Sequence, residues 1–355
     1  MKKILIVVSV YRQGERIHPI IPKLSENAEL GLLCVHQMSN RIPWNGKHDM
    51  RQYFHKTYDK YFSQIYQNWK QIDYSKYDAV IFDDCRDKAE EIPYKLIYNQ
   101  AKKHNTIVFA NQHGNRDFNP KQWELSHVNQ VFDYCFVFGN HTKKLIKPFA
   151  KKDVYLPAGI PSNDALCNYK QTSEYILIIT NFLANERKVF PNTFGDEFVK
   201  KINLKKLQEK YQKPVVVKIK NRDRHFAIGN PYQTDISFVE KVLLDNDIYG
   251  QVIRDVEDDN LMISKAHSVI GISSTLCYKP IQLGIPTVIL DGGNFIGSFS
   301  EYNGYCSTDY IEQVIDSQLK SGRNSDYIKN ILEGGIDYNS SNIYVKHVMD
   351  ILNEI

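Results

Sequence analysis

A chain of 355 residues is longer than a domain with a single hydrophobic core usually is, so we expect two domains. With 42% hydrophobic and 24% charged residues, the composition is that of a globular protein and argues against disorder. The net charge of +4 is too small for a nucleic-acid-binding surface, so we expect no nucleic-acid partner. The six cysteines form no C-x-x-C pair, which predicts free structural thiols and a cytoplasmic location.

The N-terminal half alternates short apolar runs with amphipathic stretches. MKKILIVVSV has the look of a secretion signal, but YRQGER follows in place of a cleavage site, so we predict a buried first strand. The predicted strands are 3–10, 30–36, 79–83, 106–110, 134–138 and 154–156, separated by helical patterns at 50–72, 92–104 and 140–149. Apolar strands joined by helices predict a parallel sheet covered on both faces.

The C-terminal half repeats this rhythm after a Pro/Gly-rich crossing at 157–173. The predicted strands are 175–180, 215–219, 251–256, 269–272 and 287–290, and the predicted helices are 197–211, 236–245, 260–266 and 280–283. A last helix, 341–355, is expected to pack back on the first domain. We therefore expect an α/β fold of two Rossmann-like, doubly wound parallel-sheet domains, 1–160 and 174–340, facing across a cleft. No stretch approaches the ~20 apolar residues that cross a bilayer.

Ligands of such folds lie beyond the carboxyl ends of the strands, so the residues that follow each strand are the first candidates. Ser273, Ser274 and Thr275 follow the strand at 269–272, and hydroxyls with free backbone N–H groups suit a phosphate. The alternative is a single serine that caps the helix. Pro280 implies that this helix either starts late or is kinked.

The sequence NQHG follows the strand at 106–110. His113 is placed to take a proton from an attacking hydroxyl, and Gly114 allows a sharp turn. Asn111 and Gln112 are expected to contact substrate. The alternative is a loop histidine held by a neighbouring group.

Basic residues crowd the end of the strand at 215–219. Lys218, Lys220 and Arg222 suit a diphosphate or an acidic sugar, although a solvated basic loop is an open alternative. Polar side chains that follow other strands are further substrate-binding candidates: Arg12, Asn181 and Arg187. For the paired carboxylates Asp83 and Asp84, a hydrogen-bonding role at the strand end is favoured over catalysis. For the lysines of HTKKLIKPFAKKD, a solvated helix face is favoured over contact with anionic lipid headgroups.

Several signatures are missing. The sequence has no P-loop, no G-x-G-x-x-G after the first strand, no G-x-S-x-G, no H-E-x-x-H, and no D-x-D that would hold a catalytic metal. These absences argue against a P-loop nucleotidase, a dehydrogenase and a metal-dependent enzyme.

Within residues 251–290, VIRDVEDDNLMISKAHSVIGISSTLCYKPIQLGIPTVIL resembles the donor-side signature of the GT-B glycosyltransferase superfamily. LPAGIPSND at 156–164 is similar to its interdomain crossing, and the NQHG loop to the His-Gly loop of its capsule and teichoic-acid transferases. Two features depart from the family. Lys279 stands where a carboxylate often holds the donor ribose, and VKIKNRDRH replaces the Lys-Pro-His-Pro motif of sialic acid and Kdo transferases.

The resemblance implies a metal-independent transferase without a cofactor, acting by a single, inverting displacement. It would move a sugar, or a polyol phosphate, from a nucleotide-activated donor to a saccharide or lipid-linked saccharide in capsule, lipopolysaccharide or teichoic acid synthesis. Its location would be cytoplasmic, with peripheral contact to the inner membrane as a further expectation. Lys279 is included among the substrate-binding candidates. Two alternatives stay open: a UDP-N-acetylglucosamine 2-epimerase-like enzyme, which would rely on Asp83, Asp84 and Glu186, and a non-catalytic nucleotide-sugar-binding protein.

Overall fold

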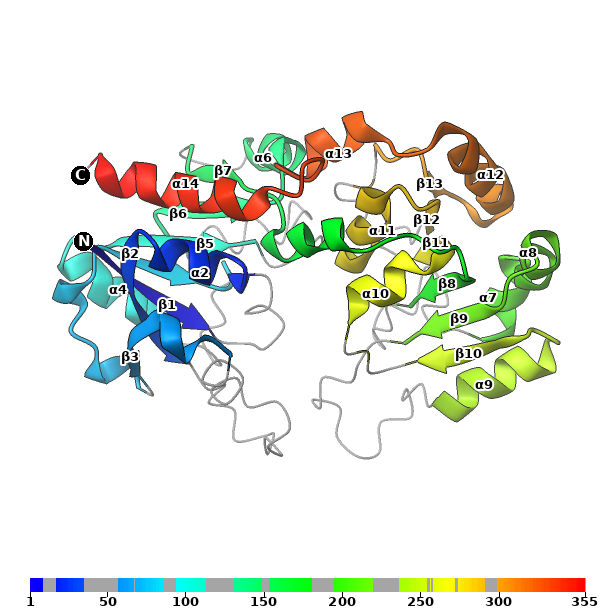
Figure 1. Cartoon of the computed structure of the whole chain (residues 1–355), viewed down its shortest axis with the longest axis horizontal. Helices are drawn as coiled ribbons and strands as arrows, with labels where there is room; N and C mark the ends of the chain where they lie inside the picture. The colour runs from blue at the N-terminus through cyan, green and yellow to red at the C-terminus, as the bar shows by residue number, and fades with distance from the viewer. Residues whose placement is uncertain are drawn as a thin grey trace. The chain divides into compact units, whose positions relative to one another are not determined.

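Two parallel sheets, each in a compact unit of its own, form the framework of the computed structural model (Figure 1). Unit 1 comprises Met1–Asp164 and Lys329–Ile355, and unit 2 comprises Ala165–Ile328. The described residues are 1–8, 17–34, 57–66, 68–85, 94–112, 131–148, 153–180, 195–219, 236–253, 256, 258–271, 274–290, 299 and 301–354. The predicted class, two parallel-sheet α/β units, is confirmed.

The sheet of unit 1 has seven strands in the order β3-β2-β1-β4-β5-β6-β7, and every pair is parallel. The strands are β1 Lys2–Val8, β2 Ala28–Cys34, β3 Phe62–Tyr66, β4 Ala79–Phe82, β5 Ile107–Asn111, β6 Tyr134–Val137 and β7 Tyr155–Pro157. The helices are α2 Ile20–Ser25, α4 Tyr94–Lys103, α6 Asn140–Ile146 and α14 Ser340–Asn353, with 3-10 turns at Asp59–Tyr61, Trp69–Gln71, Tyr74–Lys76 and Pro161–Asn168.

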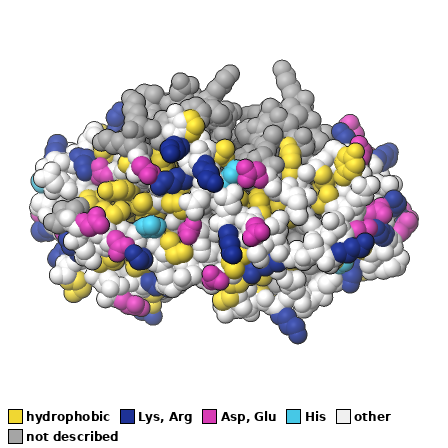
Figure 2. All heavy atoms as spheres, turned by 90° about the horizontal axis from the view of Figure 1, so that it is seen from above, with side chains coloured by type: hydrophobic (Ala, Val, Ile, Leu, Met, Phe, Trp, Pro, Cys, Tyr) yellow, Lys and Arg dark blue, Asp and Glu magenta, His cyan; other side chains and the backbone are white. Residues whose placement is uncertain are grey.

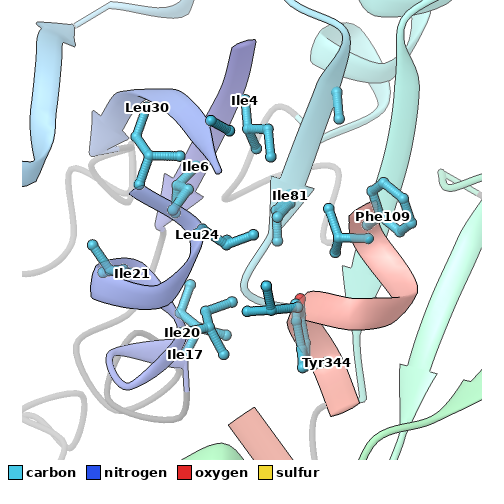
Figure 3. Packing of buried hydrophobic residues seen from close by; sticks show 14 of the residues in the cluster. Ile4, Ile6, Ile17, Ile20, Ile21, Leu24, Leu30, Ile81, Phe109 and Tyr344 are labelled. Carbon is cyan, nitrogen blue, oxygen red and sulfur yellow. The ribbon is translucent and has the colours of Figure 1, made fainter. Parts of the chain in front are cut away.

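Alternate side chains of these strands enter two separate cores, because successive residues of a strand face opposite sides of its sheet. Ile4, Ile6, Ile81 and Phe109 pack on the face covered by α2 and α14 (Figure 3). Their sequence neighbours, such as Leu5, pack on the other face with α4. Burial on both faces explains why the strands read as continuous apolar runs.

The helix predicted over 50–72 is wrong for residues 62–66 and 68–72. Phe62–Tyr66 instead forms edge strand β3, paired in parallel with β2, and Trp69–Gln71 forms a 3-10 turn. The Ser63 hydroxyl supports this pairing by donating to the Leu30 carbonyl (3.2 Å) and to Glu29 (2.8 Å). Aromatic spacing favoured a helix, but aromatic residues also suit strands, and pairing with β2 decided the outcome.

The sheet of unit 2 has six strands in the order β10-β9-β8-β11-β12-β13, again all parallel. The strands are β8 Tyr175–Ile179, β9 Val215–Lys218, β10 Gly250–Ile253, β11 Ala266–Gly271, β12 Thr287–Leu290 and β13 Tyr305–Cys306. The helices are α7 Asp196–Lys201, α8 Leu204–Tyr211, α9 Ile236–Asp245, α10 Asp259–Ser264, α11 Tyr278–Leu283, α12 Ile311–Ser321 and α13 Ser325–Ile331. The helix predicted over 197–211 is two helices, because Asn203 adopts a left-handed conformation with φ +51°.

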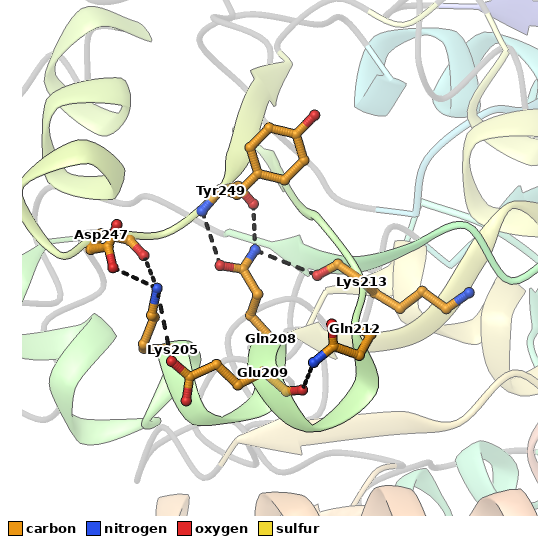
Figure 4. A network of polar contacts seen from close by, with 7 residues as sticks. All are labelled: Lys205, Gln208, Glu209, Gln212, Lys213, Asp247 and Tyr249. Atoms are coloured by element: carbon orange, nitrogen blue, oxygen red, sulfur yellow. Dashed lines mark hydrogen bonds and ion pairs between the residues drawn. The ribbon is translucent and has the colours of Figure 1, made fainter.

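Two glutamines fix the starts of strands in unit 2. The Gln208 carboxamide accepts from the Tyr249 N–H (2.9 Å) and donates to the Tyr249 carbonyl, tying α8 to the start of β10 (Figure 4). Gln318 does the same for Thr287, accepting from its N–H (2.7 Å) and donating to its carbonyl (3.1 Å). Each glutamine side chain therefore gives a hydrogen-bonding partner to both the N–H and the carbonyl of one residue at the start of a strand.

The C-terminal segment is anchored at several points of unit 1. The Asp164 carboxylate accepts from the N–H groups of Ser340 (2.9 Å) and Ser341 (2.7 Å) at the start of α14. The Glu333 N–H donates to the Phe138 carbonyl, just past β6 (2.8 Å). These contacts hold α14 on the face of the sheet where Tyr344, Val348 and Leu352 enter the core.

The burial of His18, just before α2, predicts that the free energy of unfolding falls as the pH is lowered. Its side chain is 6% exposed and its ring lies 4.8 Å from that of Tyr58, and burial lowers its pKa to about 4. An unfolded histidine binds a proton near pH 6.5, so this contribution is present above that pH and is lost as the pH falls towards 4. We expect this group to lower the free energy of unfolding by roughly 2 kcal/mol between pH 7.5 and pH 5.

Urea unfolding of the wild type and of His18→Gln at both pH values tests this expectation. The pH dependence should be smaller in the variant by that amount, and identical dependence in both proteins would contradict it. His104→Gln, at an exposed position of the same unit, is the control that should behave like the wild type.

The described helices include none with the length and apolarity of a membrane-crossing segment. On the face drawn in Figure 2, basic and acidic side chains are interspersed. On α6, Lys143 pairs with Asp153 (2.8 Å) and Lys144 is exposed, as is Lys147 just after the helix. Lys151 and Lys152 lie outside the described residues.

Candidate functional site

The carboxyl edge of the unit 2 sheet contains the switch point of its topology. The chain runs outward from β8 to β9 and β10 on one side and from β11 to β12 and β13 on the other, which is the 3-2-1-4-5-6 order of doubly wound folds. Ligands of these folds bind where the strand order reverses, beyond the carboxyl ends. In unit 2 that position lies between the ends of β8 and β11.

A hydroxyl-rich turn follows β11 at this position. Thr275–Cys277 forms a 3-10 turn, and α11 begins only at Tyr278, so the late-start alternative holds. Pro280 is therefore in the first turn of α11, where a missing N–H breaks no intrahelical bond. A Cβ on Gly271 would lie 2.5 Å from the Cys277 sulfur, so glycine lets this turn pack closely on the strand.

Ser274 serves this turn as a cap. Its hydroxyl oxygen accepts from the Leu276 N–H (3.3 Å), and its carbonyl accepts from the Cys277 N–H (3.0 Å). A hydroxyl that accepts in this way still has its own hydrogen to donate. Capping and phosphate binding are therefore compatible for Ser274, which is partly exposed, as is Thr275. Burial raises the pKa of the Cys277 thiol to about 12, so it stays protonated near neutral pH and is a poor nucleophile.

Lys218 is the last residue of β9. In the sheet, β9 lies next to β8, and β8 lies next to β11, the strand that the hydroxyl-rich turn follows. Its side chain is 7% exposed, and its ammonium donates to the Ile219 carbonyl (3.2 Å). The Lys218 carbonyl accepts from both the N–H (3.1 Å) and the hydroxyl (3.0 Å) of Thr180, which follows β8. Thr180 thus joins the carboxyl ends of β8 and β9. Sequence reasoning missed this residue, although its place directly after an apolar strand was a usable signal.

Lys279 belongs to a polar network that links α11 to α10. Its ammonium donates to the Asn260 carboxamide oxygen (2.7 Å). Asp258 caps α10 by accepting from the N–H groups of Asn260 and Leu261, and it also accepts from the Tyr169 hydroxyl (2.7 Å). Burial raises the pKa of Asp258, but these hydrogen bonds and the Lys279 charge outweigh it, so the pKa lies below its usual value. Substrate contact by Lys279 stays a prediction.

At the carboxyl edge of unit 1, Asn111 and Gln112 make internal contacts. The Asn111 amide nitrogen donates to the Phe82 carbonyl (2.7 Å) and to the Tyr344 hydroxyl (3.0 Å). Gln112 is buried, its N–H donates to the Phe136 carbonyl (2.9 Å), and its side-chain oxygen accepts from the Phe138 N–H (2.9 Å). These bonds tie the end of β5 to β4, β6 and α14.

Asp83 and Asp84 follow β4 and are each 1% exposed. Asp83 accepts a hydrogen bond from the hydroxyl of Tyr94, which is itself buried on α4. This is the strand-end role favoured from the sequence for Asp83. A carboxylate enclosed in this way is poorly placed to meet a substrate.

Eight of the predicted site residues lie outside the described part of the chain and stay predictions: Arg12, His113, Gly114, Asn181, Arg187, Lys220, Arg222 and Ser273. The described residues contain no group of three or more His, Cys, Asp or Glu side chains arranged to hold a metal ion.

Solved structures share this fold over nearly the whole chain. UDP-GlcNAc 2-epimerase from Methanocaldococcus jannaschii matches with a TM-score of 0.64 and 14% identity, covering 98% of this chain and 99% of that one. The Neisseria meningitidis enzyme bound to UDP-GlcNAc matches with a TM-score of 0.59 and 15% identity, covering 98% and 100%. The wall teichoic acid polymerase TagF matches with a TM-score of 0.56 and 11% identity, covering 99% and 89%.

Neither a protein-family model nor a curated protein sequence matches the chain. The structural likeness establishes the GT-B fold. At such low identity it leaves the reaction to be argued from the residues of this chain.

Proposed function

We propose that the protein binds a nucleotide-activated sugar, or polyol phosphate, on unit 2 and transfers the activated group to a hydroxyl of a saccharide or lipid-linked saccharide. The hydroxyl turn Ser274–Thr275, beside the switch point of the unit 2 sheet, is the observation that carries this proposal. Similar structures include an epimerase bound to UDP-GlcNAc, a complex of MnaA with UDP, and a variant of TagF soaked with CDPG. The products belong to bacterial surface polysaccharide, such as capsule, lipopolysaccharide or teichoic acid.

In the proposed donor site, Ser273, Ser274 and Thr275 bind the diphosphate through hydroxyls and backbone N–H groups. Ser274 suits this role because its capping bond uses an acceptor site and leaves its hydrogen for a phosphate oxygen. Lys218, Lys220 and Arg222 offset the negative charge that develops on the leaving group. The reaction needs no metal ion and no cofactor.

In the proposed reaction, His113 takes the proton of the acceptor hydroxyl as that oxygen attacks the donor. For a sugar donor, the oxygen bonds to the sugar carbon, the bond from this carbon to the diphosphate breaks, the nucleoside diphosphate leaves, and a single displacement inverts the carbon. For a polyol phosphate donor, the oxygen bonds to the phosphorus that carries the polyol, the bridge between the two phosphates breaks, and the nucleoside monophosphate leaves. Gly114, Asn111 and Arg12 support the acceptor on unit 1, and the buried Gln112 supports it indirectly by fixing the end of β5. The further donor contacts on unit 2 are Asn181, Arg187 and Lys279. The protein works in the cytoplasm, with peripheral contact to the inner membrane where the acceptor is lipid-linked.

Ser274→Ala tests the donor site. We expect the dissociation constant for the bound nucleotide diphosphate to rise about 10-fold to 100-fold, because a hydrogen bond to a charged group is lost. Isothermal titration calorimetry on the full chain measures this change. Ser321→Ala, at an exposed position at the end of α12, is the control and should bind like the wild type. Equal affinity in all three proteins would remove Ser274 from the site.

A UDP-GlcNAc 2-epimerase-like reaction is the second candidate, because such enzymes match the chain over 98–100% of both partners. The burial of Asp83 and Asp84 counts against these two carboxylates as the groups that would move a carbon-bound proton, whereas Glu186, the third carboxylate of this alternative, lies outside the described residues. Product analysis separates the candidates. An epimerase converts the nucleotide sugar alone, whereas a transferase releases nucleotide only when an acceptor is present. Tight nucleotide binding without either product would indicate a non-catalytic binding protein.

A further inference from the structure

A hydrogen bond between the side chains of Asn111 and Tyr344 joins the end of β5 to the returning helix α14. Asn111 continues the face of β5 that carries Ile107 and Phe109, and this face is covered by α14. The Asn111 side-chain nitrogen donates to the Tyr344 hydroxyl (3.0 Å) and to the Phe82 carbonyl (2.7 Å). Asn111 stands two positions before His113, the residue that we propose as the base.

These two bonds fix the orientation of the Asn111 carboxamide. A carbonyl oxygen only accepts, so the Asn111 nitrogen, and not its oxygen, must face Phe82. The second amide hydrogen is used by Tyr344, so both donors of the side chain are satisfied. Among the described residues, no group donates to the Asn111 side-chain oxygen, and the side chain is partly exposed. The carboxamide therefore retains one acceptor at the carboxyl edge of the sheet.

Tyr344 is rigidly held. Its side chain is 1% exposed, and its ring stacks on Phe136 with centroids 3.7 Å apart and planes 25° apart. Figure 3 shows it on α14 beside Phe109 and Ile81. Asp164 accepts from the first N–H groups of α14, which fixes the start of the helix. The hydroxyl of Tyr344 is thus a fixed point against which Asn111 is set.

We infer that Tyr344 is a positioning residue: it holds the Asn111 carboxamide so that its oxygen accepts a hydrogen bond from a hydroxyl of the acceptor substrate. The substrate role rests on the proposed transferase function. A polyhydroxyl acceptor supplies the hydroxyl that donates to Asn111. The C-terminal helix then has a part in acceptor binding as well as in the core.

Tyr344→Phe, which removes only the hydroxyl, tests this inference. We expect kcat/KM for the acceptor to fall about tenfold, through KM more than kcat, with the nucleotide dissociation constant unchanged. Asn111→Ala should lower kcat/KM at least as much. In that background Tyr344→Phe should have no further effect, because Tyr344 acts through Asn111. Tyr77→Phe is the matched control, since it removes another buried hydroxyl of unit 1, one that donates to Tyr66 (3.0 Å).

Hydrogen exchange of the peptide that contains residues 107–112 gives a second readout that does not depend on turnover. Exchange should be several-fold faster in Tyr344→Phe and unchanged in Tyr77→Phe. Equal exchange in the two variants would overturn the positioning role, and additive losses in the double variant would overturn its action through Asn111. If exchange is faster in Tyr344→Phe but the wild type turns over no nucleotide-activated donor, the positioning role is supported and the proposed function is overturned instead.

Discussion

Replacing His113 with alanine is expected to lower kcat about 10²-fold to 10⁴-fold, the usual contribution of a positioned general base. The dissociation constant for nucleotide should stay within about twofold, because the proposed donor contacts lie on unit 2 and need no proton transfer. His113 follows the end of β5, where Asn111 and Gln112 are bonded to β4, β6 and α14. A strand end fixed in this way is a suitable support for a base that follows it in the chain.

Steady-state rates and calorimetry on the same preparations measure both quantities. His104→Ala is the matched control, because it removes an exposed histidine of the same unit, just after α4. A parallel loss of turnover and nucleotide affinity in His113→Ala would indicate a structural role. Unchanged turnover would remove His113 from the mechanism.

Gly159→Ala should lower the free energy of unfolding by about 2–5 kcal/mol, combining backbone strain with overpacking. Gly159 has φ +72°, which a residue with a Cβ adopts only at a cost. An added Cβ would also lie 2.1 Å from the Glu333 carbonyl oxygen and 2.2 Å from the Ser340 hydroxyl oxygen. Glu333 cannot easily retreat, because its N–H is bonded to Phe138. The substitution should therefore loosen the contact between the C-terminal segment and the rest of unit 1.

Gly139→Ala separates the two causes of this loss. Gly139 is extended, with φ −166°, so an alanine there is unstrained, but its Cβ would lie 2.4 Å from the carbonyl carbon of Ile331. We expect a smaller loss of about 1–3 kcal/mol from overpacking alone. Denaturant unfolding with a probe in unit 1 compares the two variants. Wild-type stability in Gly159→Ala would contradict the described packing of residues 333–340.

The strands were predictable because burial on both faces makes them apolar throughout. The range 287–290 agrees with β12, and most other predicted strands agree within two residues. The helix predicted over 50–72 failed because an edge strand such as β3, with partly exposed side chains, has no continuous apolar run. The break at Asn203 was not predicted for another reason: a single left-handed residue leaves the apolar spacing on both sides intact.

The candidate site was predictable only where chemistry follows directly after a strand. Ser274 and Thr275 were predicted in this way, Lys218 was predicted from the charge at the end of β9, and the roles of all three stay predictions. Tyr344 was not found, because in sequence it is one more apolar position of a C-terminal helix, and its bond to Asn111 joins residues 233 positions apart. The Asp258–Lys279 network was missed for the same reason, since it depends on how α10 packs against α11.

Thermal unfolding of the full chain with CMP, CDP, UDP and GDP tests most directly whether this protein acts on a nucleotide-activated donor. A nucleotide at about 100 times its dissociation constant stabilises the folded state by about 2.7 kcal/mol, so the matching nucleotide should raise Tm by several degrees in a saturable manner. We expect such a rise in Tm for at least one of the four nucleotides. No rise with any of them, or with the corresponding nucleotide sugars, would contradict it.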